Sequence, residues 1–355
     1  MPTRGARTVH ELETMADRLS SFLSQADPAK GVAVCTDYEP MAGGYSRTMA
    51  RAQVEWSESD AEVLVLRGDP PPGQALIETD RDAEWVVHRA LTDIDGLSIP
   101  PARYYDATGE HLGTKCIVMD YCEGVSFQSF VEGRDDLADQ ALVLAQQLAP
   151  ILTVDVAALP EAMQRPDPDT VIDALIDQWA EISDNHCNTS PVYRYVIKWL
   201  GLNKPPPMEP TLVHGDFQNP NIMIDDAASC SMIDWEFAHI GDPREDLGWY
   251  NLYSSVAGTN LYEANPAGFL DRYRALTGFD ETVVNELTVG YFTIAGAAKV
   301  AQEVLHAIDG LASGEVQSTM AAHQAAGALT MGNGIYLQAI SAMETALRAT
   351  SGGAS

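Results

Sequence analysis

The sequence is poor in positive charge. Only 21 of its 355 residues are Lys or Arg, against 51 Asp and Glu, so the formal net charge is −30. A surface of that sign repels the phosphates of nucleic acid and of anionic membranes, and we expect neither as a partner. The same charge would suit a cationic small molecule, or it would simply maintain solubility. An anionic ligand would need positive charge, or a metal ion, gathered locally.

Long apolar runs and paired cysteines are also absent. No stretch approaches the roughly 20 apolar residues that a membrane span requires, and residues 1–30 lack the apolar segment of a signal peptide. The five cysteines, at positions 35, 116, 122, 187 and 230, include no Cys-x-x-Cys pair. We therefore expect reduced thiols in a cytoplasmic protein and no zinc site. With 46% hydrophobic residues, the chain is long enough for one large or two small domains.

Acidic and amide side chains gather between apolar runs in the second half of the chain. Residues 212–213 and 222–224 predict two buried strands, and the loop between them carries Asp216 and Asn221. Asp234 follows the next apolar run. Phosphoryl transfer requires a similar set: one carboxylate that orients a hydroxyl, and oxygen ligands for Mg²⁺. A lone loop of this kind is usually a turn capped by its own side chains, but the joint spacing favours the catalytic interpretation.

The order of residues within this stretch carries a family resemblance. His214-Gly215-Asp216, with Asn221 five residues later, resembles the catalytic loop of protein kinases, which has Arg in the middle position. With Gly there, and Ile-Asp-Trp-Glu at 233–236 instead of Asp-Phe-Gly, the pattern is more similar to the aminoglycoside phosphotransferase and choline kinase family of small-molecule kinases. The resemblance implies that Asp216 is the catalytic base, that Asn221 and Asp234 hold Mg²⁺, and that His214 orders the loop.

A second run, residues 241–249, extends the resemblance, because the family has Gly-Asp-Pro-x-x-Asp-Leu after its metal ligand. Asp242 as N-cap and Pro243 as first residue predict a helix, and the resemblance makes Asp246 a structural anchor. Acidic Glu236 and Asp242 could attract an amine-bearing alcohol. Aromatic residues could instead build a flatter acceptor site, although each is more often core: Trp179, Tyr193, Tyr195, Trp249, Tyr250 and Tyr253.

The first third of the chain predicts a small sheet with helices. A helix is expected over residues 8–26, with Thr8 and Glu11 as a capping box, and another over 80–93. Strand patterns cover residues 31–39, 47–56, 62–67, 102–106 and 115–121. The resemblance implies a five-stranded antiparallel N-lobe.

The same resemblance assigns nucleotide contacts to this lobe. Gly43, Gly44 and Ser46 would form a hairpin turn over the phosphates; Arg67 stands where the family has Lys, and Glu84 where it has the partner of that Lys. The backbone of Asp120, Tyr121 and Cys122 would contact adenine. Each assignment has an ordinary alternative. The glycines would form a plain hairpin turn, Arg67 would cap an exposed strand end, and Glu84 would be solvated. Residues 120–122 would be the end of a buried strand and its turn.

From about residue 125 the pattern becomes helical, with segments at 138–152, 170–182, 191–200, 266–276, 280–309 and 315–348. We predict an α+β, two-lobed, protein-kinase-like fold with an N-lobe over 1–120 and a C-lobe over 121–355. The implied activity moves the γ-phosphate of ATP or GTP to a hydroxyl of a small molecule, with Mg²⁺ as cofactor. The alternatives are a nucleotide-binding regulator without turnover, which the Arg67 departure would suit, and a metal-dependent hydrolase.

Overall fold

The computed structural model describes residues 9–41, 47–70, 80–92, 94, 96–161, 163–186, 191–257, 259–314, 334 and 336–349. Predictions for Thr8, Gly43, Gly44 and Ser46 lie outside the described residues. The chain divides into two compact units, the first comprising residues 1–93 and 98–123 and the second residues 94–97 and 124–355. The main division therefore falls after residue 123, where the sequence suggested 120.

Unit 1 contains a five-stranded antiparallel sheet, as predicted. Its strands are β1 (Ala33–Met41), β2 (Thr48–Trp56), β3 (Glu62–Gly68), β4 (Ala102–Asp106) and β5 (Cys116–Asp120), in the order β1-β2-β3-β5-β4. Each bound lies within two residues of its prediction, because the strands are short runs that are bounded by turn residues in the sequence.

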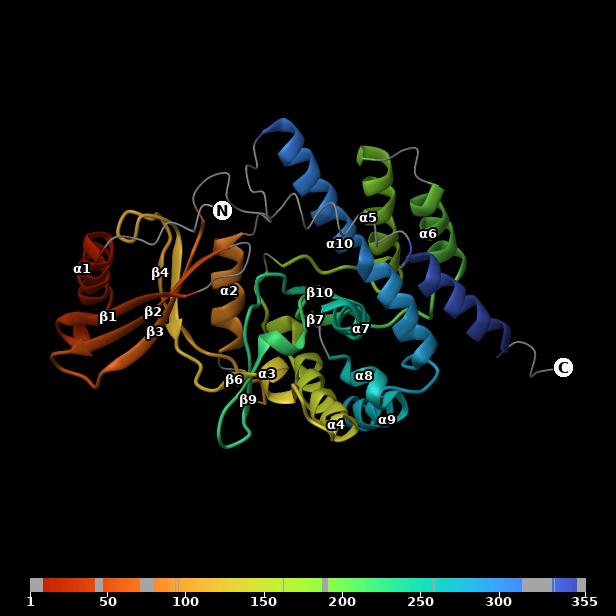
Figure 1. Cartoon of the computed structure of the whole chain (residues 1–355), viewed down its shortest axis with the longest axis horizontal. Coiled ribbons are helices and arrows are strands. Elements are labelled where there is room, and N and C mark those ends of the chain that lie inside the picture. The colour runs from red at the N-terminus through yellow and green to blue at the C-terminus, as the bar shows by residue number, and fades with distance from the viewer. Residues whose placement is uncertain are drawn as a thin grey trace. The chain divides into compact units, whose positions relative to one another are not determined.

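Helices lie on both faces of this sheet: α1 (Val9–Ala26) on one and α2 (Arg81–Leu91) on the other (Figure 1). Successive strand residues face opposite sides, so Leu64 and Leu66 pack with α1, while Val65 belongs to the cluster on the α2 side. The same alternation places Arg67 on the side of Val65. The strand period therefore explains why this cation meets α2.

Unit 2 combines short strands with helices. β7 (Thr211–Val213) pairs with β10 (His239–Gly241), and β8 (Ile222–Ile224) pairs with β6 (Val125–Ser126) and β9 (Cys230–Met232). The longer helices are α4 (Leu137–Leu148), α5 (Val171–His186), α6 (Pro191–Leu202), α7 (Glu245–Ala257), α9 (Pro266–Thr277) and α10 (Glu286–Ser313), with shorter α3 (Phe127–Val131) and α8 (Leu261–Ala264). Residues 336–349 are also helical.

The helical core of unit 2 is built from α5, α6, α10 and residues 336–349. Trp179 and Tyr193, two of the aromatic candidates for an acceptor site, are buried in it. The Nε1–H of Trp179 donates to the backbone carbonyl of Ala295 at 3.1 Å. These two residues therefore belong to the core. Among the described helices, none combines the length and hydropathy that a bilayer crossing needs.

Two helix starts differ from the prediction. The helix expected from Asp242 and Pro243 begins at Glu245, because the Asp242 side chain accepts from the Arg244 N–H and closes a turn first. The helix expected from residue 280 begins at Glu286. There the Asn285 side chain accepts from the Thr288 N–H and the Thr288 hydroxyl accepts from the Asn285 N–H, a reciprocal cap that sets the start.

Candidate active site

The predicted catalytic loop lies between β7 and β8, and Asp234 lies just after β9. The Ile233 N–H donates to the Asn221 carbonyl at 2.9 Å, which joins the end of the loop to the residue before Asp234. Asp234 has a φ of +68°, in the left-handed region that Asp tolerates better than most residues. Short strands and one backbone contact thus bring together positions 13 residues apart in sequence.

Asp246, from the first turn of α7, ties down the start of the loop. Its two carboxylate oxygens accept from the backbone N–H groups of His214 (2.8 Å) and Gly215 (2.9 Å). Burial raises the pKa of Asp246 to about 6, although these two N–H groups lower it. Gly215 has a φ of +78°, and a Cβ there would lie 2.4 Å from the Phe237 carbonyl oxygen, so only glycine fits.

His214 is fully buried beneath the loop. Its Nδ1 accepts from the Asp216 N–H at 3.2 Å, so Nε2 carries the proton that faces the Ile233 carbonyl at 3.0 Å. The ring lies 4.4 Å, centroid to centroid, from that of Trp235. Both ring nitrogens are occupied by the backbone. His214 is therefore placed to order the loop and not to shuttle a proton.

The Asp216 carboxylate accepts several hydrogen bonds. Oδ1 accepts from Gln218 Nε2 and from Trp249 Nε1, both at 2.9 Å. Oδ2 accepts from Gln218 Nε2 and Asn221 Nδ2, both at 2.8 Å. Burial raises the pKa of Asp216; the charge of Lys299 lowers it and that of Asp234 raises it again. A fixed, desolvated carboxylate of this kind suits a group that accepts a hydrogen bond or a proton from a hydroxyl.

The oxygen atoms of Asn221 and Asp234, close to Asp216, fit a magnesium ion that is shared with a bound ligand. Asn221 Nδ2 also donates to the Asp216 carbonyl at 2.9 Å, so its amide nitrogen is committed to the loop and its Oδ1 is left as a ligating oxygen. Asp234 supplies a carboxylate close enough to shift the pKa of Asp216. Within the described residues no three His, Cys, Asp or Glu side chains form a metal cluster. Mg²⁺ commonly completes such a partial set with phosphate oxygens and water.

Lys299 is a site residue that the motif does not contain. From α10, its Nζ donates to the Gly215 carbonyl at 2.7 Å and lies 3.5 Å from the ring centroid of Phe237 and 4.5 Å from that of Trp249. The sequence did contain a feature that could have singled out Lys299, because it is the one charged residue between positions 287 and 302. Gln218 lay inside the motif but was likewise not assigned a role.

The residues predicted as acceptor contacts have different surroundings in the structure. Asp242 is fully buried and both its oxygens contact Arg244, which argues against the acceptor-binding role suggested by the sequence. Glu236 is half-buried, two residues beyond Asp234. Trp249 is 7% exposed and directs its N–H at Asp216. Tyr250 is buried and donates to Asn219 Oδ1 at 2.9 Å, while Tyr195 is exposed and donates to a Glu344 carboxylate oxygen at 2.8 Å.

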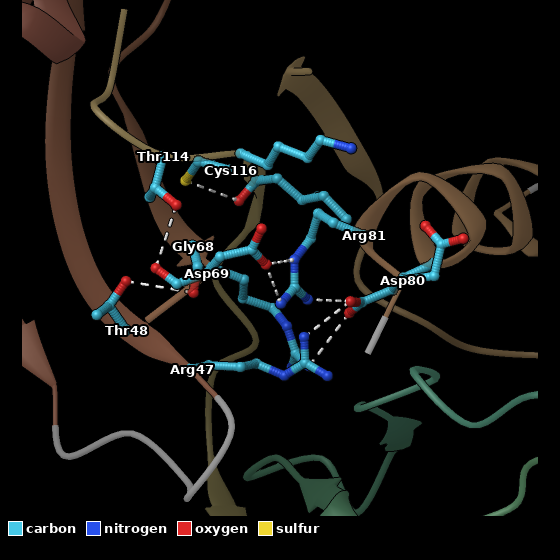
Figure 2. Close-up of polar contacts among 12 residues, drawn as sticks. Arg47, Thr48, Gly68, Asp69, Asp80, Arg81, Thr114 and Cys116 are labelled. Atoms are coloured by element: carbon cyan, nitrogen blue, oxygen red, sulfur yellow. Dashed lines mark hydrogen bonds and ion pairs between the residues drawn. The ribbon is translucent and has the colours of Figure 1, made fainter. Parts of the chain in front are cut away.

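In unit 1, three arginines converge on Glu84. Glu84 is 2% exposed and pairs with Arg47 Nη1 at 2.8 Å, with Arg67 Nη2 at 3.2 Å and with Arg81 Nη1. Arg81 also pairs with Asp69 at 2.9 Å. In Figure 2, Arg47 and Arg81 point their guanidinium groups toward one another from the start of β2 and from α2.

This arrangement excludes two of the simpler interpretations of unit 1. Arg67 is 3% exposed, so it does not cap a solvent-exposed strand end, and Glu84 is not a solvated helix residue. The contacts of Arg47 and Arg81 were not expected from the sequence. They gather positive charge locally in a strongly acidic protein.

The backbone proposed to contact adenine is partly engaged within unit 1. The Asp120 N–H donates to the Pro101 carbonyl and the Tyr121 N–H to the Val63 carbonyl, both at 3.0 Å. The Asp120 side chain pairs with Arg103 at 2.6 Å. These two N–H groups are therefore unsuited to donate to a base.

Sequence comparison identifies the family. Residues 37–287, well over half of the chain, match the phosphotransferase enzyme family, and the chain belongs to it. Acyl-CoA dehydrogenase family member 10 of Mus musculus is 26% identical over 52% of this chain and 18% of its own length. Acyl-CoA dehydrogenase family member 11 of Pongo abelii is 25% identical over 67% of this chain and 33% of its own length. The chain thus spans at most a third of these relatives.

Solved structures agree on the fold. A Ralstonia eutropha protein provisionally named an aminoglycoside phosphotransferase is similar over 93% of this chain and 98% of its own, with TM-score 0.71 and 18% identity. Macrolide 2′-phosphotransferase MphH of Brachybacterium faecium covers 87% and 98%, with TM-score 0.60 and 18% identity. Aminoglycoside phosphotransferase APH(4)-Ia, in complex with ADP and hygromycin B, covers 80% and 92%, with TM-score 0.52 and 17% identity.

Proposed function

We propose that this protein transfers the γ-phosphate of a nucleoside triphosphate to a hydroxyl of a small molecule, with Mg²⁺ as cofactor. The observation that carries the proposal is the state of Asp216: a half-buried carboxylate held by hydrogen bonds beside Asn221 and Asp234, in a chain of the phosphotransferase family. Relatives in this fold bind ADP or AMP-PNP, which supports a nucleotide donor. A nucleotide-binding regulator without turnover would not require an oriented base of this kind, and a hydrolase would use it on water instead of on an acceptor hydroxyl.

Each proposed role follows from a side chain's surroundings. Asp216 accepts the proton of the acceptor hydroxyl, and its burial makes it a better base than an exposed carboxylate. Asn221 and Asp234 would ligate Mg²⁺, which, when bound, neutralises charge that develops on the transferred phosphoryl group. The catalytic contribution of the chain is therefore positioning and electrostatics.

The nucleotide contacts are proposed in unit 1. Arg67, ion-paired with Glu84, would grip phosphate bidentately where the family resemblance expects Lys. Gly43, Gly44 and Ser46 stay proposed phosphate contacts, and the Asp120–Cys122 segment stays a proposed adenine contact. Glu236 stays a proposed acceptor contact.

A substitution series tests the assignment. Asp216→Asn keeps the shape of the side chain but removes the charge that accepts a proton, so we expect turnover to fall by at least about a thousandfold while the thermal shift produced by Mg-ATP persists. Asp226→Asn is the matched control, because Asp226 is an exposed residue of the β8–β9 turn. Near-normal turnover of Asp216→Asn on the true acceptor would show that the role is assigned wrongly.

The acceptor has to be found by screening. The names of similar proteins supply two classes, aminoglycosides and macrolides, and the names of two relatives add acyl-CoA compounds, of which those with a hydroxyl would be tested. Amino alcohols and sugars complete the panel. ATP consumption above the acceptor-free rate, abolished by Asp216→Asn and retained by Asp226→Asn, would identify the class.

A further inference from the structure

Two helices outside the catalytic motif reach Asp216 and its neighbour. Trp249, on α7, donates its Nε1–H to Asp216 Oδ1 at 2.9 Å. Lys299, on α10, donates to the carbonyl of Gly215 at 2.7 Å. Gln218 and Asn221 also donate to the carboxylate, but they belong to the loop itself and would move with it. Contacts from α7 and α10 therefore fix the position of the loop relative to the rest of unit 2.

Trp249 and Lys299 also contact each other. The Lys299 ammonium lies 4.5 Å from the centroid of the Trp249 ring and 3.5 Å from that of Phe237, so it sits among aromatic rings. Such cation–π contacts strengthen where water is excluded, and Trp249 is 7% exposed. The ring is held on a second side by Tyr253, with a centroid separation of 6.0 Å and a stacked geometry. The indole is thereby fixed with its N–H directed at Oδ1.

We propose that Trp249 and Lys299 are positioning residues that hold the Asp216 carboxylate in the orientation that receives the acceptor hydroxyl; the proposal rests on the function assigned above. Trp249 acts on the carboxylate itself, and Lys299 acts through the Gly215 carbonyl and the indole ring. This replaces the acceptor contact that the sequence suggested for Trp249. Because a reacting group misplaced by about 1 Å can cost a hundredfold in rate, loss of either contact acts on kcat.

The first test compares two tryptophans of the same unit. Trp249→Phe removes the N–H but keeps a ring for Lys299, so we expect kcat to fall by about 10- to 100-fold, with KM for Mg-ATP and acceptor changed by less than about threefold. Trp199→Phe is the control: Trp199 is 4% exposed, and within the described residues its Nε1 has no hydrogen-bond partner. If both variants have the same kcat, the proposal is overturned.

Lys299 is tested by conservative rescue. Lys299→Met removes the cation and should lower kcat with little change in KM, while Lys299→Arg keeps a donor and a cation–π partner and should recover part of the loss. Lys198→Met, at an exposed position of α6, controls for the loss of a positive charge. A Lys299→Arg variant as slow as Lys299→Met, or a Lys299→Met variant as fast as the control, contradicts the assigned role.

A spectroscopic measurement separates this proposal from the proposed function. The ¹H–¹⁵N indole resonance of Trp249, assigned by its absence in Trp249→Phe, should move upfield in Asp216→Ala because its carboxylate acceptor is gone, while that of Trp199 stays unchanged. An unmoved Trp249 resonance overturns the contact, whatever the activity. A moved resonance in a protein with full Asp216→Asn turnover instead refutes the proposed function and leaves the contact in place.

Discussion

Replacing Asp246 by Asn has two opposite effects on the free energy of unfolding: it removes a buried charge, and it removes a hydrogen-bond acceptor. Burial raises the pKa of this carboxyl to about 6, from 3.8 in the unfolded chain. Asp246 is held in its charged form at neutral pH, at a cost of about 3 kcal/mol in the free energy of unfolding. Asn removes that cost. It also leaves one acceptor oxygen for the two N–H groups of His214 and Gly215, losing about 1–3 kcal/mol for the buried donor left without a partner.

These terms nearly cancel at neutral pH, so Asp246→Asn should change the free energy of unfolding by less than about 2 kcal/mol there. The sign of the pH dependence is more decisive. A raised folded-state pKa gives stability that is complete below about pH 4 and is lost as the pH rises through about 6. Between about pH 8 and about pH 5, the wild-type protein therefore gains about 1.4 kcal/mol from this group that the variant cannot gain.

The assay is urea unfolding of both proteins at several pH values, followed by far-ultraviolet circular dichroism and by tryptophan fluorescence. Coincidence of the two signals tests whether the two units unfold together, which a single free energy requires. The variant should be about 1.4 kcal/mol worse, relative to wild type, at pH 5 than at pH 8. A difference that does not change with pH would refute the reasoning. Turnover should fall as well, because the loop loses one of its two anchoring bonds.

Two further substitutions have clear expectations. Gly248→Ala would put a Cβ 2.2 Å from the backbone carbonyl carbon of Phe292 and force α7 and α10 apart. We therefore expect urea unfolding to show a free energy of unfolding lower by at least about 2–3 kcal/mol. Gly296→Ala is the control, because the atoms nearest to its Cβ would be 3.9 Å away, and this variant should be as stable as the wild type or more stable. His239 pairs with Glu245 at 3.1 Å, and although burial alone would lower its pKa, the carboxylate raises it to about 9. The stability from this pair is present below about pH 6.5 and is lost as the pH rises through about 9. Across that window the free energy of unfolding of the wild type should fall by about 0.5 kcal/mol relative to that of His239→Gln, a small value because the pair is partly exposed. An identical pH dependence of the two proteins would contradict the pairing.

The sheet of unit 1 and most helices could be predicted because their signals are local. The short strand runs of β1 to β5 and the apolar period of α1 and α4 are recognisable from residues only a few positions apart. The starts at Glu245 and Glu286 were misjudged because turns with their own side-chain caps preceded them. An N-cap residue is recognisable in sequence, but its competition with a neighbouring turn is decided by packing.

The loop motif alone predicted the candidate residues Asp216, Asn221 and Asp234, because each adjoins a short apolar run that is recognisable in the sequence. What surrounds them was decided by tertiary structure. Lys299 and Trp249 lie 83 and 33 residues beyond Asp216, and the convergence of Arg47 and Arg81 on Glu84 joins a strand start to a helix. Such contacts depend on how helices pack against strands distant in the chain, and no spacing within a segment encodes that packing.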